Sequence, residues 1–137
     1  MDLPTRRPIS LILTIGLVGI MGVAGAANGP RELFTAPAGL PLVLAGLVTT
    51  YGVAGLVAVP GLWFLKRWGL FAMALWAGAG TAAAGIAPIA YSDDGSNRWA
   101  AVATALLLGV GLGALVRHTR RTLWGLRPRQ APPSPTP

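Results

Sequence analysis

The side chains that usually carry out chemistry in proteins are scarce in this sequence of 137 residues. It has no cysteine, so disulfides, thiol catalysis and cysteine-ligated metal centres are excluded within this chain. Its single histidine, His118, lies among arginines, where we expect a solvated side chain. Asp93 and Asp94 are paired carboxylates, but the following Gly95 is typical of an exposed turn, whereas general acid–base catalysis needs a water-poor pocket. The sequence therefore predicts a protein that is not an enzyme and that binds neither a metal ion nor a cofactor.

Ionisable residues are also absent from four long apolar windows. These windows are residues 8–30, 33–65, 68–92 and 99–116, and they contain 23, 33, 25 and 18 residues. A membrane-spanning helix needs about 20 apolar residues, so each window holds one span. Ionisable residues inside spans usually mark proton relays, coupled transport or ligand counter-ions. The four-helix small multidrug transporters, for example, typically rely on a membrane-embedded glutamate, which these windows lack.

The windows predict an all-α fold, a polytopic transmembrane four-helix bundle. The composition agrees, because 11% of the residues are charged, whereas soluble domains average about 25%. We expect spans at about residues 9–27, 40–62, 69–90 and 99–116. Residues 1–124 then form one transmembrane domain, and the Pro-rich, basic tail at residues 125–137 is expected to be disordered.

Glycine and proline predict where the helices end. We expect the first span to end at residues 28–30, Asn-Gly-Pro, because these are strong helix breakers. Pro60 removes a helix donor, so we expect a kink or an end there. The fourth helix is expected to continue beyond its span through Arg117 to Trp124, along the membrane surface.

Lysine and arginine residues are distributed unevenly between the two sides of such a bundle. Nine flank the termini or lie in the connection at Lys66 and Arg67, and only Arg31 and Arg98 lie in the other two connections. Cytoplasmic connections of membrane proteins carry the excess of basic residues. We therefore expect both termini in the cytoplasm and a multi-pass protein of the inner (plasma) membrane.

A second interpretation of the first window stays open. Arg6 and Arg7, the apolar stretch after them and a small-residue site at residues 24–26 also fit a cleaved signal peptide. The apolar stretch is longer than the about 7–15 residues of such a signal, so we expect an uncleaved anchor. Cleavage would leave three spans with the same charge pattern, and charge therefore does not decide between the two.

Basic and aromatic residues gather at the ends of the spans, and the chain has a net charge of +7. Tryptophan prefers the headgroup boundary, and long cationic side chains reach from apolar surroundings to water. We expect these residues to contact anionic lipid headgroups rather than nucleic acid. They are Trp63, Lys66, Arg67, Trp68, Arg117, Arg120 and Arg121.

Small residues at regular spacing predict how the spans pack, because they let helix backbones approach closely in lipid. The most regular row lies in the fourth window and consists of Ala101, Ala105, Gly109 and Gly113. Shorter rows are Gly46, Thr50 and Ala54; Ala74, Gly78 and Ala82; and Ala77, Thr81 and Gly85. The first window has a three-residue ladder of Gly16, Gly19, Gly22 and Gly25. The fourth-window row predicts a helix-packing role, with a second copy of the chain or a larger membrane complex as partner.

The nine residues from Gly61 to Gly69 read Gly-Leu-Trp-Phe-Leu-Lys-Arg-Trp-Gly. This segment resembles the loop between the second and third spans of many small, uncharacterised bacterial four-helix inner-membrane proteins. The resemblance covers one loop and its flanks, and it implies this topology without implying an activity.

We therefore expect a non-catalytic integral membrane protein, an accessory, structural or assembly subunit that acts by helix packing within the bilayer. The alternative is a small transporter or pore for an uncharged or lipophilic solute. It depends on Thr49, Thr50 and Tyr51, the densest group of polar side chains in the windows, lining a small cavity. Threonines in spans also bond to their own helix or bridge to a neighbour, which is the simpler interpretation. A sensor of the lipid surface that uses the basic tail is a further hypothesis.

Overall fold

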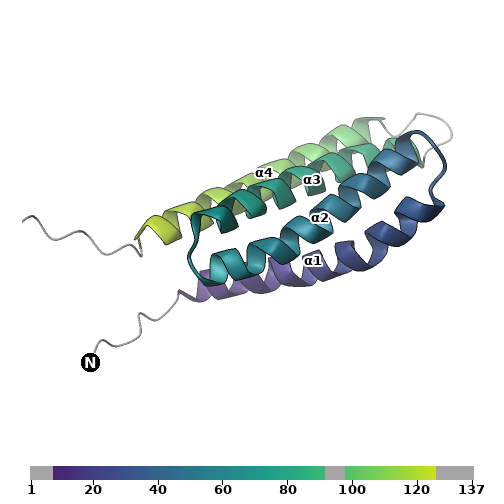
Figure 1. Cartoon of the computed structure of the whole chain (residues 1–137). Helices are drawn as coiled ribbons and strands as arrows, with labels where there is room; N and C mark the ends of the chain where they lie inside the picture. Colours follow the sequence, from purple (N-terminus) through teal and green to yellow (C-terminus); the bar gives the residue numbers. More distant parts are fainter. Residues whose placement is uncertain (1–7, 92–97, 126–137) are drawn as a thin grey trace, which may run out of the picture.

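The computed structural model describes residues 8–91 and 98–125, which form four α-helices (Figure 1). They are α1 (Ile9–Thr35), α2 (Leu40–Trp63), α3 (Arg67–Ala90) and α4 (Arg98–Gly125). Each helix is long and apolar enough to cross a membrane. The predicted all-helical fold with four helices is confirmed, and the helices indicate a multi-pass membrane protein. The turn expected at Asp93 and Asp94, and the Pro-rich tail from residue 126 onward, lie outside the described residues.

The helices pack in chain order, α1 on α2, α2 on α3 and α3 on α4, whereas α1 and α4 make little contact (Figure 1). The core contains Leu11 of α1, Leu62 of α2 and Leu123 of α4, and it extends to Met73 and Trp76 of α3. Most of these core residues lie in the half of the bundle that contains the start of α1 and the end of α4. Helix α4 is the least covered of the four, with Ala101, Thr119 and Leu123 as its buried residues.

A tight turn joins α2 to α3 at the segment that resembles other small membrane proteins. Leu65 has a positive φ of 55°, and the backbone N–H of Lys66 donates to the carbonyl of Gly61 over 2.8 Å. The N–H of Leu65 donates to the carbonyl of Leu62 over 3.1 Å, which completes the Schellman pattern of helix termination. The two glycines of the segment, Gly61 and Gly69, then lie in direct backbone contact where α2 and α3 cross. The glycines therefore let the end of α2 and the start of α3 lie side by side.

The prediction that the first helix ends at residues 28–30 is wrong, since α1 continues through Pro30 to Thr35. Asn28 Nδ2 donates to the carbonyl of Ala24 over 3.0 Å, so this polar side chain is bonded to its own helix. Gly29 is buried against the backbone of Thr49 on α2. Packing between the two helices thus outweighs the local breaker signals. Residues 24–26, the site of the alternative cleavage, lie inside α1.

Proline has little effect on the other helix ends. Pro60 lies within α2, which continues to Trp63, and Pro88 lies within α3, which continues to Ala90. The missing N–H of a proline removes one helical hydrogen bond, which a long helix packed on its neighbours tolerates. The expected helical continuation beyond Val116 is confirmed, because α4 runs without a break to Gly125.

Candidate functional site

Helices α1 and α2 approach each other closely along a row of glycines. A Cβ atom on Gly22 would lie 2.9 Å from Leu56 N, and a Cβ atom on Gly25 would lie 2.9 Å from Gly52 Cα. A Cβ atom on Gly29 would lie 2.6 Å from Thr49 N. Cβ atoms essentially never lie at these distances from backbone atoms, so any larger residue would force the two helices apart. The contact follows three small residues on one face of α1.

Two of the predicted small-residue rows do not form helix contacts as expected. In the first-window ladder, Gly22 and Gly25 pack on α2, but an added Cβ on Gly16 would meet nothing within 4 Å. In the row of α2, Gly46 is equally open and Thr50 is exposed. The glycines of α2 that do pack on α1 are Gly52 and Gly55, which the four-residue spacing missed. Gly52 and Gly55 are three residues apart, as Gly22 and Gly25 are. This matching spacing was the sequence signal that could have predicted the contact between α1 and α2.

The predicted row of α4 is divided between two environments. Ala101 is buried, the Cβ of Ala105 would lie 3.1 Å from one added to Gly85, and a Cβ on Gly109 would lie 3.2 Å from Thr81 Cγ2. Ala105 and Gly109 therefore pack on α3. The fourth, Gly113, has no atom within 4 Å of an added Cβ and is exposed. The row ends in an uncovered surface.

That uncovered surface is a groove of about 490 Å³ on the outside of the bundle, here called the α3–α4 groove. Most of its lining residues are small: Ala74, Ala77, Gly78, Thr81 and Ala82 of α3 with Gly109, Leu112, Gly113 and Val116 of α4. An added Cβ on Gly78 would also meet nothing within 4 Å. The row Ala74, Gly78 and Ala82 thus faces away from the chain's own helices and meets the end of the α4 row.

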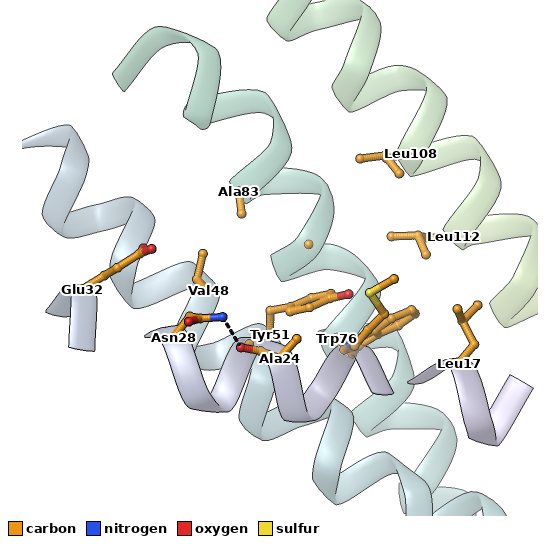
Figure 2. A pocket seen from close by; sticks show the side chains of 13 residues that line it. Leu17, Ala24, Asn28, Glu32, Val48, Tyr51, Trp76, Ala83, Leu108 and Leu112 are labelled. Atoms are coloured by element: carbon orange, nitrogen blue, oxygen red, sulfur yellow. Dashed lines mark hydrogen bonds between the residues drawn. The ribbon is translucent and has the colours of Figure 1, made fainter. Parts of the chain in front are cut away.

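A second groove, here called the α1–α4 groove, opens between the two helices that make little contact (Figure 2). Its volume is about 560 Å³, and all four helices contribute to its lining. The lining residues are Leu17, Met21, Ala24, Gly25, Asn28 and Glu32 of α1; Val48 and Tyr51 of α2; Trp76, Gly80 and Ala83 of α3; and Leu108 and Leu112 of α4. All but a few of them are apolar.

An aromatic pair from the two middle helices lies at the base of the α1–α4 groove. The rings of Tyr51 and Trp76 stack with their centroids 5.3 Å apart and their planes at 23° (Figure 2). Trp76 is almost fully buried, and its indole edge lies over Gly55, where an added Cβ would be 2.9 Å from Trp76 Cδ1. Tyr51 also lies over Gly80, whose added Cβ would be 2.8 Å from Tyr51 Cε2. Glycines on two helices therefore make room for this pair.

The polar cluster of Thr49, Thr50 and Tyr51 does not line one cavity. Thr49 donates to the carbonyl of Ala45 over 2.8 Å, and Thr50 donates to that of Gly46 over 2.9 Å. Both threonines line an outer surface between α2 and α3, whereas Tyr51 lies in the α1–α4 groove. Neighbours on a helix point about 100° apart, so adjacency in the sequence did not place these three side chains together.

The predicted headgroup residues lie at one end of the bundle, since the α2–α3 turn and the end of α4 are on the same side (Figure 1). Trp63, Lys66, Arg67 and Trp68 are exposed around the turn. On α4, Arg117, Arg120 and Arg121 are exposed and form a shallow surface with Trp124. The guanidinium carbon of Arg120 lies 5.9 Å from the centre of the Trp124 ring, a cation–π distance. The basic groups thus form one collar, whose contact with lipid stays a prediction.

Side chains that could bind a metal ion are few in the part of the chain that the structure describes. Among those residues, no three of His, Asp and Glu lie close enough together to hold a metal ion. His118 is exposed on α4. No protein-family model, curated protein or solved structure matches the chain. The two grooves and the basic collar are therefore the features of the described chain that suggest a function.

Proposed function

We propose that the protein is a non-catalytic accessory or assembly subunit of a membrane complex, and that a partner helix packs into the α3–α4 groove. The observation that carries the proposal is the uncovered small-residue surface of Gly78, Ala82 and Gly113. In lipid, apolar area alone does not drive helices together, because lipid tails are as apolar as leucine. Small residues do promote association, because they allow close contact between backbones.

The chain's own packing supports this use of small residues. Helices α1 and α2 cross at Gly25 and Gly52, and helices α2 and α3 cross at Gly61 and Gly69. The α3–α4 groove is also rich in small residues, but none of the four described helices lies in it. Helix α4 is also the least buried of the four, so a partner reaches it without displacing another element.

The proposed setting is the bacterial inner membrane with both termini in the cytoplasm. Nine basic residues on the side of the termini against two on the opposite side support this orientation. In this orientation the basic collar of Lys66, Arg67 and the arginines of α4 faces the cytoplasmic leaflet, whose anionic headgroups attract it.

The alternative, a pore or transporter for an uncharged solute, has less support. The hydroxyl groups of Thr49 and Thr50 bond to their own helix, and these side chains do not share a cavity with Tyr51. A polar pathway through the bundle would need hydroxyl groups that face one another.

Leucine substitutions at the open glycines test the proposal. Gly113→Leu and Gly78→Leu place a bulky side chain at the α3–α4 groove, from positions where an added Cβ meets no atom within 4 Å. Gly111→Leu is the matched control, because Gly111 is equally open but does not line the groove. Gly109 is a poorer choice, since its added Cβ would lie 3.2 Å from Thr81 Cγ2 and would disturb the chain's own packing.

The measurement is twofold: self-association of fluorescently tagged protein by energy transfer in vesicles, and quantitative co-purification from native membranes. Overfilling a tight contact costs about 1–3 kcal/mol, so we expect roughly fivefold to hundredfold weaker association for the groove variants. Gly111→Leu should associate as the unmodified protein does. Equal association and equal partner recovery for all three variants would contradict the proposal.

A further inference from the structure

The α1–α4 groove is open to the side of the bundle, where the hydrocarbon of a membrane would lie. Its walls are the apolar side chains of Leu17 and Met21 on α1 and of Leu108 and Leu112 on α4 (Figure 2). It shares only Leu112 with the α3–α4 groove. Helices α1 and α4 make little contact, so no part of the described chain closes the groove from outside. A groove in this position is filled from the bilayer.

The dimensions of the groove decide what fills it. Along α1 it extends from Leu17 to Glu32, a rise of about 22 Å at 1.5 Å per residue. Its volume is about 560 Å³. A groove that follows one helix over this length has the elongated shape of an extended hydrocarbon chain.

Polarity changes along the groove in the way that an amphiphile requires. Leu17 lies at one end of the groove, Asn28 and Glu32 lie at the other end near the end of α1, and the aromatic pair of Tyr51 and Trp76 lies between them (Figure 2). Asn28 Nδ2 donates to the carbonyl of Ala24, which leaves its Oδ1 as an acceptor. The Glu32 carboxylate is also an acceptor and is exposed. The polar end therefore presents acceptors to a group that donates hydrogen bonds.

We infer that the α1–α4 groove binds one acyl chain of a membrane phospholipid whose headgroup carries an ammonium group. The chain lies against Tyr51 and Trp76, and the ammonium donates to the Glu32 carboxylate. A distance of about 22 Å from Leu17 to Glu32 exceeds half of a hydrocarbon core about 30 Å thick, so the groove accommodates a chain from one leaflet. With the termini in the cytoplasm, that leaflet is the outer one.

Native mass spectrometry of the full chain, released from nanodiscs of equal parts phosphatidylethanolamine and phosphatidylglycerol, tests this inference. The unmodified protein should retain one phosphatidylethanolamine. Ala24→Phe fills the groove from α1 and should lose the bound lipid, whereas Ala27→Phe, on an exposed residue of α1 outside the groove, should retain it. Glu32→Gln should shift the retained lipid toward phosphatidylglycerol.

A second filling variant protects the test against a folding defect. Leu108→Trp fills the groove from α4 and should also lose the lipid, so it decides the matter if Ala24→Phe does not fold. Gly113→Leu lies in the other groove and should retain the lipid, which separates this inference from the proposed function. Retention of lipid by both filling variants, or bound lipid in the same proportions as the nanodisc, would overturn the inference.

Discussion

The crossing of α1 and α2 at Gly25 offers a sharp quantitative test, because two helix backbones are in direct contact there. A Cβ on residue 25 would lie 2.9 Å from Gly52 Cα and 2.9 Å from Tyr51 Cδ1. Ordinary contacts between carbon atoms are about 3.5–4.0 Å. Gly25→Ala therefore requires α1 to move away from α2 by roughly 0.6–1.1 Å at this point.

We expect Gly25→Ala to lower the free energy of unfolding. Overfilling a tight contact costs about 1–3 kcal/mol, and the preference of a helix for alanine over glycine offsets up to about 1 kcal/mol of that. The net loss is therefore about 0–3 kcal/mol, with a midpoint of about 1.5 kcal/mol. Gly16→Ala is the matched control on the same helix, because its added Cβ meets no atom within 4 Å. It should leave the free energy of unfolding unchanged or raise it by up to about 1 kcal/mol.

The assay is reversible unfolding in mixed micelles at increasing mole fractions of sodium dodecyl sulfate, followed by circular dichroism. Gly52→Ala meets the backbone of Gly25 and Ala26 from the opposite side and should be destabilised as well. One separation of the helices relieves both added methyl groups, so the double variant should lose less than the sum of the single losses. The reasoning fails if Gly25→Ala and Gly16→Ala unfold at the same detergent fraction.

Three further substitutions test other contacts in the same unfolding assay. Leu65→Gly should raise the free energy of unfolding by about 1 kcal/mol. Leu65 has a φ of 55°, and the left-handed conformation costs a leucine about 1–2 kcal/mol. If the free energy of unfolding does not rise, contacts of the leucine side chain offset this cost. Trp76→Ala should lower it by about 3–5 kcal/mol, since Trp76 is buried and stacked on Tyr51, whereas the exposed Trp99→Ala should change it by less than about 0.5 kcal/mol. Thr50→Val should change it by less than about 0.5 kcal/mol, because the exposed Thr50 hydroxyl donates to the carbonyl of Gly46 in its own helix. A larger loss would indicate a partner for that hydroxyl outside this helix.

The four helices were predictable because the charge-free windows record a physical constraint. In hydrocarbon, backbone groups must be satisfied within the segment, so each uncharged window of span length forms a helix. The exact ends were less predictable. By local preference, Asn28, Gly29 and Pro30 predict the end of a helix. Gly29 is instead buried against Thr49 of α2, and a contact with another helix is not visible in the local sequence.

The helix contacts were only partly predictable, for a related reason. The chain has 19 glycines, so rows of small residues occur on several faces of each helix. A row shows where a close approach is possible, but the partner helix selects which row is used. Gly22 and Gly25 are used because Gly52 and Gly55 oppose them, whereas Gly46 is left open. The aromatic pair could not be predicted at all, since its two members come from different helices.

The open side of the bundle follows from these same contacts. Glycines hold α1 against α2, and Thr81 against Gly109 holds α4 against α3, so each outer helix is fixed to an inner one. The rings of Tyr51 and Trp76 lie at the base of the groove between the outer helices. In water an apolar gap of this kind would favour collapse, because closing it removes apolar surface from solvent. In a bilayer, hydrocarbon would fill the gap and closing it would gain little, so the proposed lipid-accessible groove is compatible with a stable four-helix fold.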